Sequence, residues 1–329
     1  MDSVFKNKDV LITGGLGFIG SNVAMKLVGL GARVCIVDAL MPDYGGNMFN
    51  VEEIKGRIQV TIADIRDNDR IEGLVRGRDY IFNIAGQISH IDSMNDPLTD
   101  LEINCQSQLV FLEACRHNNP QAKIAFASTR QVYGKPVQLP VNEDHPILPC
   151  DINGINKMAG EWYHSLYSRV YGMRIASLRL TNTYGPHLLM KHNRQGFIGW
   201  FIRQAIDGEE IQIYGDGTQI RDLNYVDDVA DALLMAASQE ECWGKVFNLG
   251  AGEHISLLAF TQLIIKIAGS GSYRLVPFPS EKKKIDIGSY FADFSKFSNI
   301  SGWYPRVFLE EGLKKTIDFY RKYKEFYWD

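Results

Sequence analysis

A glycine-rich turn directly after a short apolar segment is the feature that most constrains the fold of this chain. Residues 10–12 read Val-Leu-Ile, and residues 13–20 continue as Thr-Gly-Gly-Leu-Gly-Phe-Ile-Gly before a helical stretch at 21–30. Glycine permits positive φ and the close approach of a pyrophosphate, and the N-terminus of the next helix offers free N–H groups to phosphates. The sequence therefore predicts a dinucleotide-binding βαβ unit that opens at Gly14.

Asp38, at the end of the next apolar run, indicates which dinucleotide is bound. A carboxylate there accepts hydrogen bonds from the adenosine ribose and repels a 2′-phosphate, so NAD is favoured over NADP. The alternative is that Asp38 only caps the following turn. Asp64 and Ile65 follow a third apolar run, where an adenine edge would lie. The cofactor contacts predicted from this segment are Gly14, Gly17, Phe18, Ile19, Gly20, Asp38, Asp64 and Ile65.

Strand-like runs alternate with amphipathic helical stretches through the first half of the chain, which favours an α/β fold with a Rossmann-type doubly wound parallel sheet. The expected strands are 10–12, 34–37, 59–62, 80–84, 123–127 and 174–178, and the clearest helical stretches are 104–116 and 157–171. After residue 186 the loops lengthen, which indicates a smaller C-terminal α/β substrate lobe. We expect an NAD-binding domain at 1–180, with a return segment near 222–250, and a substrate lobe over 181–329.

Composition excludes several classes of function. The net charge is −4, so no basic field is available for nucleic acid. No apolar run reaches the roughly 18 residues that a membrane span needs, and the N-terminus lacks an apolar signal segment. The five cysteines show no metal-ligand spacing, and no His/carboxylate cluster suggests a metal. These features predict a cytoplasmic protein with buried, reduced cysteines and no metal site.

Several further motifs, taken in their order along the chain, resemble one enzyme group. The chain is similar to the extended short-chain dehydrogenases/reductases of the nucleotide-sugar epimerase/dehydratase group from its first strand to Tyr304. The motifs are the Gly-x-x-Gly-x-x-Gly turn with Asp38, Asn83-Ile84-Ala85-Gly86-Gln87, Ser128-Thr129-Arg130-Gln131-Val132-Tyr133-Gly134, Asn182-Thr183-Tyr184-Gly185-Pro186 and the run from Tyr214 to Asp222.

The resemblance implies a reaction in which a sugar hydroxyl, usually at C4, is oxidised by hydride transfer to NAD. It assigns the hydroxyl-binding role to Thr129, cofactor contacts to Ala85 and Gln87, and the lysine of a Tyr-x-x-x-Lys pair to Lys157. Asn153 occupies the tyrosine position. An amide does not ionise in the accessible pH range, so Asn153 cannot be the general base.

Three hypotheses follow for the missing base. Lys157, desolvated and with a lowered pKa, could act through water or through Thr129. Another group near the cleft could accept the proton, with His90, Tyr133 and Tyr184 as candidates. Alternatively, the chain is an inactivated or binding-only relative.

Two departures follow Thr129. Dehydratases of the resembled group place Asp-Glu there, and decarboxylating relatives also use a Glu, whereas this chain has Arg130 and Gln131. Neither side chain supplies a carboxylic acid, which disfavours a standard 4,6-dehydration. Arg130 could meet an anionic substituent such as a uronic carboxylate, or could be an ordinary surface arginine.

The resemblance also implies a nucleotide-diphosphate sugar as substrate, with a UDP-sugar favoured. Arg221 is expected to grip the diphosphate, or else to pair with Asp222 or Asp227, and Lys283 stands at a second phosphate position. The loop 187–200 is rich in donors suited to sugar recognition. The predicted substrate contacts are His90, Arg130, Asn182, Arg194, Gln195, Tyr214, Arg221 and Lys283.

Relatives of this type pair two helices across a homodimer, here the helices starting near Asn104 and Lys157. Leu109, Leu112, Trp162 and Leu166 are expected on their outer faces, and burial within the monomer is the alternative. The sequence thus favours an NAD-dependent nucleotide-sugar epimerase acting at C4 of a hexose. The alternatives are a nucleotide-sugar dehydrogenase or dehydratase with a non-standard base, and an NAD-bound sensor or scaffold without catalysis.

Overall fold

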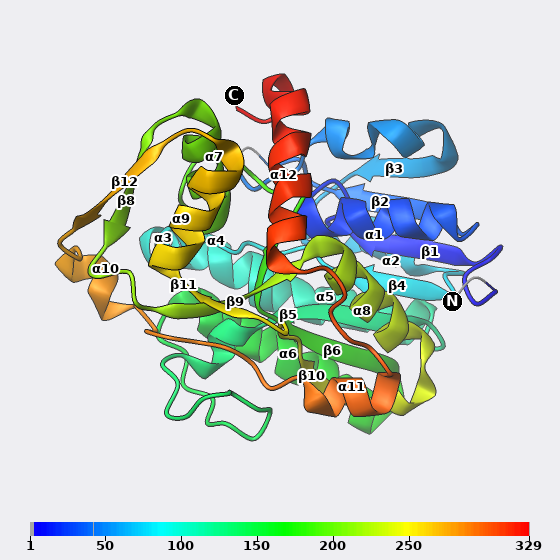
Figure 1. Ribbon diagram of the computed structural model, residues 1–329. Coiled ribbons are helices and arrows are strands. Elements are labelled where there is room, and N and C mark those ends of the chain that lie inside the picture. The colour runs from blue at the N-terminus through cyan, green and yellow to red at the C-terminus, as the bar shows by residue number, and fades with distance from the viewer. Residues whose placement is uncertain (1–2, 42, 329) are drawn as a thin grey trace.

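The protein is described by a computed structural model that covers residues 3–41 and 43–328. Its centre is a seven-stranded sheet with the order β10-β6-β5-β4-β1-β2-β3, in which every neighbouring pair is parallel (Figure 1). The predicted doubly wound α/β fold is therefore confirmed. The strands are β1 (Asp9–Thr13), β2 (Arg33–Asp38), β3 (Ile58–Ile62), β4 (Tyr80–Asn83), β5 (Lys123–Thr129), β6 (Arg174–Leu180) and β10 (Val246–Asn248).

Helices cover both faces of this sheet. One layer holds α1 (Phe18–Gly29) and α8 (Val226–Ser238), which pack against each other. The other layer holds α2 (Asn68–Val75), α5 (Ser107–Asn118) and α6 (Ile152–Tyr171), also in mutual contact (Figure 1). Shorter elements precede α5 or flank the sheet, namely η1 (Met48–Arg57), α3 (His90–Asn95), α4 (Pro97–Leu101), η2 (Glu102–Gln106), η3 (Arg130–Tyr133), η4 (Glu240–Cys242) and α11 (Ser295–Ser301).

Strand periodicity explains how the two layers are held. Side chains of successive strand residues point to opposite faces of a sheet. In β1, Val10 and Ile12 join the apolar cluster beneath α1 and α8, whereas Leu11 joins the cluster beneath α2, α5 and α6. All three side chains are fully buried. The near-continuous apolar strands recognised in the sequence are thus the central layer between two cores.

The C-terminal lobe has its own core and two small sheets. It contains the sheets β11-β9-β7 and β12-β8, covered by three main helices that surround an aromatic-rich cluster (Figure 1). Its elements are β7 (Asn182–Tyr184), α7 (Phe197–Asp207), β8 (Glu210–Tyr214), β9 (Ile220–Tyr225), β11 (His254–Ser256), α9 (Leu257–Ala268), β12 (Ser272–Val276), α10 (Ser280–Lys284), α12 (Leu309–Tyr323) and η5 (Lys324–Phe326).

Helix boundaries differ from the sequence expectation at two places. Helix α6 begins at Ile152 rather than near Lys157, because the Asp151 carboxylate accepts the Gly154 N–H and caps it. Asn104 does not start a helix, since it lies in the π-helical turn η2 before α5. Leu112 was expected on an outer face and is fully buried, whereas Leu109 is 36% exposed.

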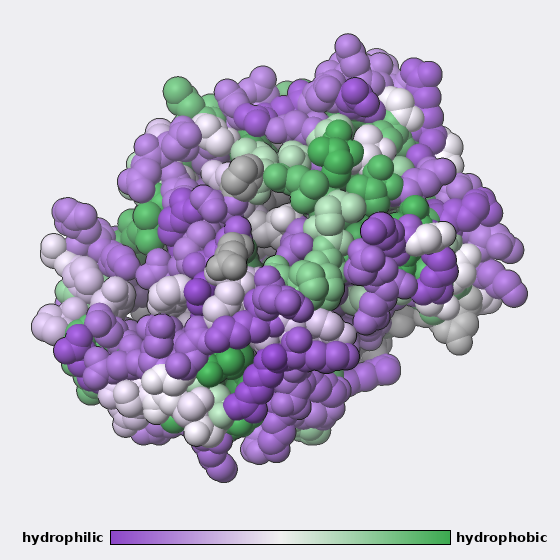
Figure 2. Space-filling model, turned by 90° about the horizontal axis from the view of Figure 1, so that it is seen from above, coloured by the Kyte–Doolittle hydropathy of each residue, from purple (hydrophilic) through white to green (hydrophobic). Residues whose placement is uncertain are grey.

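The five cysteines are free thiols, and three of them are buried. Within residues 3–41 and 43–328, no helix is long and apolar enough to cross a membrane, and no His, Cys, Asp and Glu side chains gather as metal ligands. Seen from above, the surface is mostly hydrophilic; a patch of apolar side chains lies in the upper part of the view, and smaller apolar groups lie elsewhere (Figure 2).

Candidate active site

The glycine turn between β1 and α1 forms one wall of a cavity at the carboxyl ends of the strands. Gly14 has a φ of +69°, and a Cβ added there would lie 2.9 Å from the backbone of Ala85. A Cβ on Gly20 would collide with the Gly14 carbonyl. Helix α1 has no side-chain cap at its N-terminus, so its first N–H groups are free for an anion. The turn is therefore shaped as a phosphate cradle.

Asp38 holds this turn in place. Its carboxylate accepts the Leu16 N–H at 3.0 Å and the Leu40 N–H at 2.9 Å. Burial raises the pKa of Asp38 against the opposing effect of these N–H donors. The carboxylate thus connects the glycine turn to the loop after β2 and lines the cavity at the same time. Asp38 thus has the capping role considered from the sequence and also lines the cavity.

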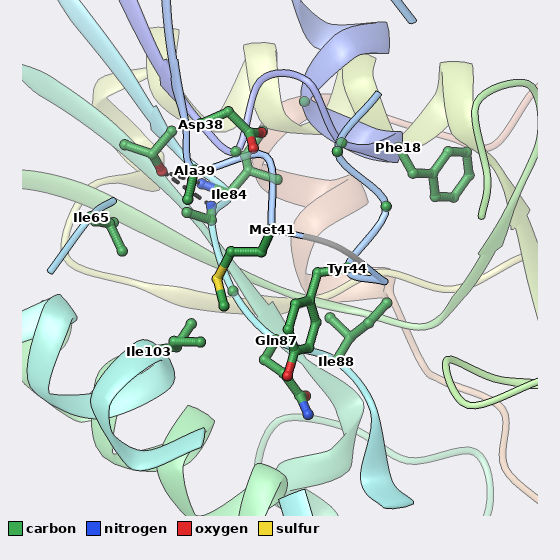
Figure 3. A pocket seen from close by; sticks show the side chains of 18 of the residues that line it. Phe18, Asp38, Ala39, Met41, Tyr44, Ile65, Ile84, Gln87, Ile88 and Ile103 are labelled. Atoms are coloured by element: carbon green, nitrogen blue, oxygen red, sulfur yellow. Dashed lines mark hydrogen bonds between the residues drawn. The ribbon is translucent and has the colours of Figure 1, made fainter. Parts of the chain in front are cut away.

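The cavity runs from Asp38 to Gln87 between mostly apolar walls (Figure 3). Met41 and Tyr44 extend into it from the loop after β2, and Ile103 lines the opposite side (Figure 3). Nothing in the sequence marked these three residues. The predicted cofactor residues that line the cavity are Gly14, Gly17, Phe18, Ile19, Gly20, Asp38, Asp64, Ile65, Ala85 and Gln87, joined by Gln195. Their arrangement fits an extended dinucleotide, with the glycine cradle placed for its phosphates.

Lys157 lies behind the wall of this cavity. A Cβ on Gly86 would collide with its Nζ, so the ammonium group approaches the cavity only because residue 86 is glycine. Burial lowers the pKa of Lys157 to about 8, and the charge of Asp100 acts in the opposite direction. Among the described residues, Lys157 has no hydrogen-bond or ion-pair partner for its side chain. The ammonium group is therefore available to a ligand in the cavity.

A cluster of amides surrounds the buried carboxylate of Asp100. Asn153 and Asn104 donate to its Oδ2 at 2.8 and 3.0 Å, and Asn156 donates to its Oδ1 at 2.8 Å. Asn153 also donates to the backbone and side-chain oxygens of Gln87 at 2.9 and 3.1 Å. The residue at the tyrosine position is thus a buried structural donor that joins α6 to the end of the cavity.

A second polar cluster lies at the start of α6. The Nδ1 of His90 donates to the Asp151 carboxylate, and the His90 Nε2 lies 2.7 Å from the side-chain nitrogen of Gln131. Burial raises the pKa of Asp151. The hydrogen bond and charge of His90, together with the Gly154 N–H, outweigh burial and hold this pKa below its ordinary value. The Gln131 N–H donates to Thr129 Oγ1 at 3.2 Å, so this cluster adjoins the predicted hydroxyl-binding residue.

Arg130 is packed inside the molecule and is not a surface arginine. Its guanidinium lies 5.0 Å from the Tyr290 ring centre and donates to Asn182 Oδ1 at 3.2 Å. Burial lowers its pKa. Within the described chain, Nη1 of Arg130, Nδ2 of Asn182 and the Tyr290 hydroxyl are buried without partners. Such orphaned donors are typical of a site that a polar ligand completes.

Arg221 lies near Arg130 at the rim of the lobe. Burial, followed by the charge of Arg130, lowers the pKa of Arg221 to about 10. It donates to the backbone carbonyls of Ile220 and Gly288 and lies 3.9 Å from Asp286, not paired with Asp222 or Asp227 as considered from the sequence. Two buried guanidinium groups in proximity favour an anionic ligand.

The remaining predicted substrate residues are dispersed. Arg194 pairs with Asp43 at 2.8 Å and with Asp92 at 3.5 Å, which ties the 187–200 loop over the cavity. Tyr214 lies beneath Lys282, whose Nζ is 5.0 Å from its ring centre. Lys283 is exposed on α10, so Lys282 and not Lys283 faces this aromatic side chain.

Two of the candidate bases do not reach the cleft. Tyr133 and Tyr184 are fully buried. The Tyr133 hydroxyl donates to Asn248 at 2.7 Å, and Tyr184 is enclosed beneath α12, where its hydroxyl donates to the Leu309 carbonyl. Burial raises the pKa of Tyr133 to about 12. Both tyrosines are part of the packed interior, so the prediction that either one accepts the proton is wrong.

The described geometry matches a known family. The model of the "NAD dependent epimerase/dehydratase family" matches residues 10–250. The chain belongs to this family. NAD is its cofactor, and it is an enzyme of the epimerase/dehydratase type. The glycine cradle and Asp38 line the cavity described above, and Lys157 approaches it behind Gly86.

Relatives within this family catalyse different reactions. A putative UDP-glucose 4-epimerase of Methanocaldococcus jannaschii is 35% identical, covering 94% of this chain and 97% of the relative. UDP-glucuronic acid decarboxylase 1 of Xenopus tropicalis is 32% identical over 96% of this chain and 72% of its own. The structure of UDP-glucose 4-epimerase with UDP-glucose from Thermotoga maritima superposes with a TM-score of 0.86 at 32% identity, covering 96% and 99% of the two chains.

Proposed function

We propose that this enzyme is an NAD-dependent nucleotide-sugar epimerase that acts by transient oxidation at C4 of a nucleotide-linked hexose. The observation that carries the proposal is the pair of residues after Thr129. Dehydration needs an acid to protonate the leaving hydroxyl, whereas Arg130 is a buried cation and Gln131 an amide that binds His90. Oxidation followed by return of the hydride needs no such acid.

The chain's own residues support this reaction at both ends of the site. Thr129 would hold the reacting hydroxyl, and the Lys157 ammonium would hold the nicotinamide ribose from behind Gly86. Arg130 and Arg221 provide two positive charges for the diphosphate end of the substrate. NAD, when bound, accepts the hydride and gives it back. The epimerase relatives at 35% and 32% identity support a UDP-sugar as the substrate.

The test is incubation of the NAD-loaded protein with UDP-glucose, UDP-galactose, UDP-N-acetylglucosamine and UDP-glucuronate, followed by NMR of the sugar. We expect the C4 epimer of at least one substrate to form without net NADH. Thr129→Val should reduce the rate by about 10²-fold or more, because the hydroxyl is then no longer held.

Other products would contradict the proposal in distinct ways. Stoichiometric NADH would identify a dehydrogenase, and a 4-keto-6-deoxy sugar would identify a dehydratase. Tight binding of a nucleotide sugar without any turnover would identify a sensor or scaffold.

A further inference from the structure

We propose that His90, positioned by Asp151, is the acid and base that replaces the missing tyrosine in the sugar oxidation. This inference rests on the proposed function. The imidazole would take the proton of the sugar hydroxyl at Nε2 and return it when the ketone is reduced.

The ring of His90 is held at both nitrogens. Its Nδ1 contacts Asp151, whose side chain is only 4% exposed, and its Nε2 contacts the side-chain amide of Gln131 at 2.7 Å. The His90 side chain itself is 35% exposed. The imidazole is therefore anchored to a buried carboxylate while part of its own surface remains exposed. A carboxylate behind Nδ1 fixes the tautomer whose lone pair is on Nε2. Gln131 donates to that lone pair in the structure, and a proton would replace this hydrogen bond when His90 acts as a general base.

The amide of Gln131 suits both protonation states of the ring. A carboxamide carries one donor group and one acceptor oxygen. With its nitrogen toward Nε2, as in the structure, Gln131 donates to neutral His90, and its own oxygen is buried without a partner. Rotation of the amide would turn that oxygen to accept from the protonated ring. A glutamate at this position would instead hold the imidazolium and prevent its use as a base.

The dyad also lies where the reaction requires it. Gln131, which contacts Nε2, donates its backbone N–H to Thr129 Oγ1. Asp151 is the residue that caps α6, two positions before Asn153. His90 follows Gln87, which lines the NAD cavity, by three residues. The imidazole is thus linked through Gln131 to the predicted hydroxyl-binding threonine, and through Asp151 to the start of the helix that has Asn153 at the tyrosine position.

Of the charged side chains on the elements around the His90 ring, Asp151 is the one that contacts the ring. Helix α6 presents Asp151, and η3 presents Arg130, whose charge also lowers the pKa of that carboxyl. On α4, Asp100 is occupied by three amide donors. On α3 itself, Asp92 lies 3.5 Å from Arg194. Because Lys157 is buried behind Gly86, we assign it to cofactor binding and not to proton transfer.

The step balances without any further reactant. The O–H bond of the sugar hydroxyl breaks and its proton goes to Nε2 of His90. The C–H bond at the same carbon breaks and its electron pair leaves with the hydrogen as hydride to NAD, and the C=O bond forms. Reduction from the opposite face reverses both transfers, so neither His90 nor the cofactor is consumed.

The first test replaces His90 in the NAD-loaded enzyme. His90→Gln should lower the epimerisation rate by 10²-fold to 10⁴-fold, the usual contribution of a general base, while the Kd for UDP-glucose changes by less than about threefold. His117→Gln is the matched control, because His117 is also beside a carboxylate, Glu113 at 3.3 Å, but lies exposed on α5. A His90→Gln enzyme with a near wild-type rate would overturn the proposal.

The second test measures the His90 ring by NMR after histidine-specific ¹⁵N labelling, with its signals assigned by their loss in His90→Gln. Asp151→Asn should move the Nδ1 and Nε2 signals of His90, because Nδ1 loses its charged acceptor and the balance of ring tautomers changes. Gln131→Glu should move the Nε2 signal, because an amide donor is replaced by a carboxylate acceptor. Asparagine is also a good N-cap, so Asp151→Asn removes the charge while α6 keeps its cap.

Failure of the proposed function and failure of the dyad are distinguishable. If no nucleotide sugar is turned over, the ring signals still report whether Asp151 and Gln131 control His90 and whether UDP-glucose perturbs it. Unchanged ring signals in both variants, or no perturbation by a bound nucleotide sugar, would refute the role of His90 whatever the activity.

Discussion

At the scale of single residues, Lys157 combines a functional position with an energetic cost. Its ammonium group is buried behind Gly86, and its pKa is about 8 against an ordinary value of 10.5. Between these two values the folded protein binds fewer protons than the unfolded chain. The buried charge of Lys157 therefore destabilises the folded state fully below pH 8. The free energy of unfolding rises as the pH increases from 8 to 10.5 and the lysine loses its proton.

Lys157→Met tests this linkage. We expect the variant to lose activity but to be more stable than the wild type at pH 7, because methionine fills similar space without a charge. The difference in unfolding free energy should shrink between pH 8 and 10.5, by about 1.4 kcal/mol for each pKa unit. Urea denaturation at pH 7 and pH 10 measures it. A constant difference would show that the ammonium is well solvated in the native state.

The residue scale also shows where sequence reasoning reaches its limit. Asp38 and the glycines could be predicted because their role is fixed by local backbone geometry next to one strand and one helix. Asn153 could be recognised as unable to act as a base, but its contacts with Asp100 and Gln87 join segments more than fifty residues apart. Asp151 as the partner of His90 has no sequence signature, since 61 residues separate them.

At the scale of secondary-structure elements, a buried ion pair joins α6 to the sheet. Arg179 on β6 donates through Nε and Nη2 to Glu161 on α6, at 2.9 and 2.6 Å, and Ser128 on β5 donates to the same carboxylate at 2.6 Å. Both charged side chains are at most 5% exposed. The pair holds α6, which carries Asn153 and Lys157, against β6, and the Ser128 hydrogen bond holds it against β5, the strand that ends at Thr129.

Breaking this pair on one side should be costly. Arg179→Met leaves the Glu161 charge buried with only Ser128 as a donor, and we expect a loss of about 3–5 kcal/mol in unfolding free energy. Arg179→Met combined with Glu161→Gln should recover much of that loss. Chemical denaturation of the single and double variants decides the matter. Equal destabilisation in both would mean that packing of the arginine, not its charge, holds α6.

The elements themselves were predictable to different degrees. The six strands expected from apolar runs are all present, because central parallel strands are buried on both faces and read as unbroken apolar segments. Strand β10 is three residues long and was foreseen only as part of a return segment. Its place at the sheet edge depends on pairing with β6, a partner that no local pattern identifies.

At the scale of the whole molecule, α5 and α6 leave apolar side chains uncovered. Leu109 on α5 is 36% exposed, and Trp162 and Leu166 on α6 are 54% and 39% exposed. Ile155 and Val170 extend the row on α6 at helical spacing. We expect a second copy of the chain to cover this face by helix pairing, as proposed from the sequence.

A charge in this face should prevent the association. Trp162→Glu should convert a dimer to a monomer in sedimentation velocity, because a carboxylate would be buried without a partner. Tyr304→Glu, which places the same charge on another exposed aromatic position at 57% exposure, is the control and should leave the assembly unchanged. A wild-type protein that sediments as a monomer at micromolar concentration would refute the expected dimer.

The order in which the sheet is completed has a consequence for synthesis of the chain. Strand β6 ends at Leu180, but its outer neighbour β10 emerges only after β7, α7, β8, β9 and α8 have been made. A nascent chain that stops after β6 and before β10 therefore presents β6 as an open edge, able to pair with another unfinished chain. The central sheet is complete only when segments from both halves of the chain are present.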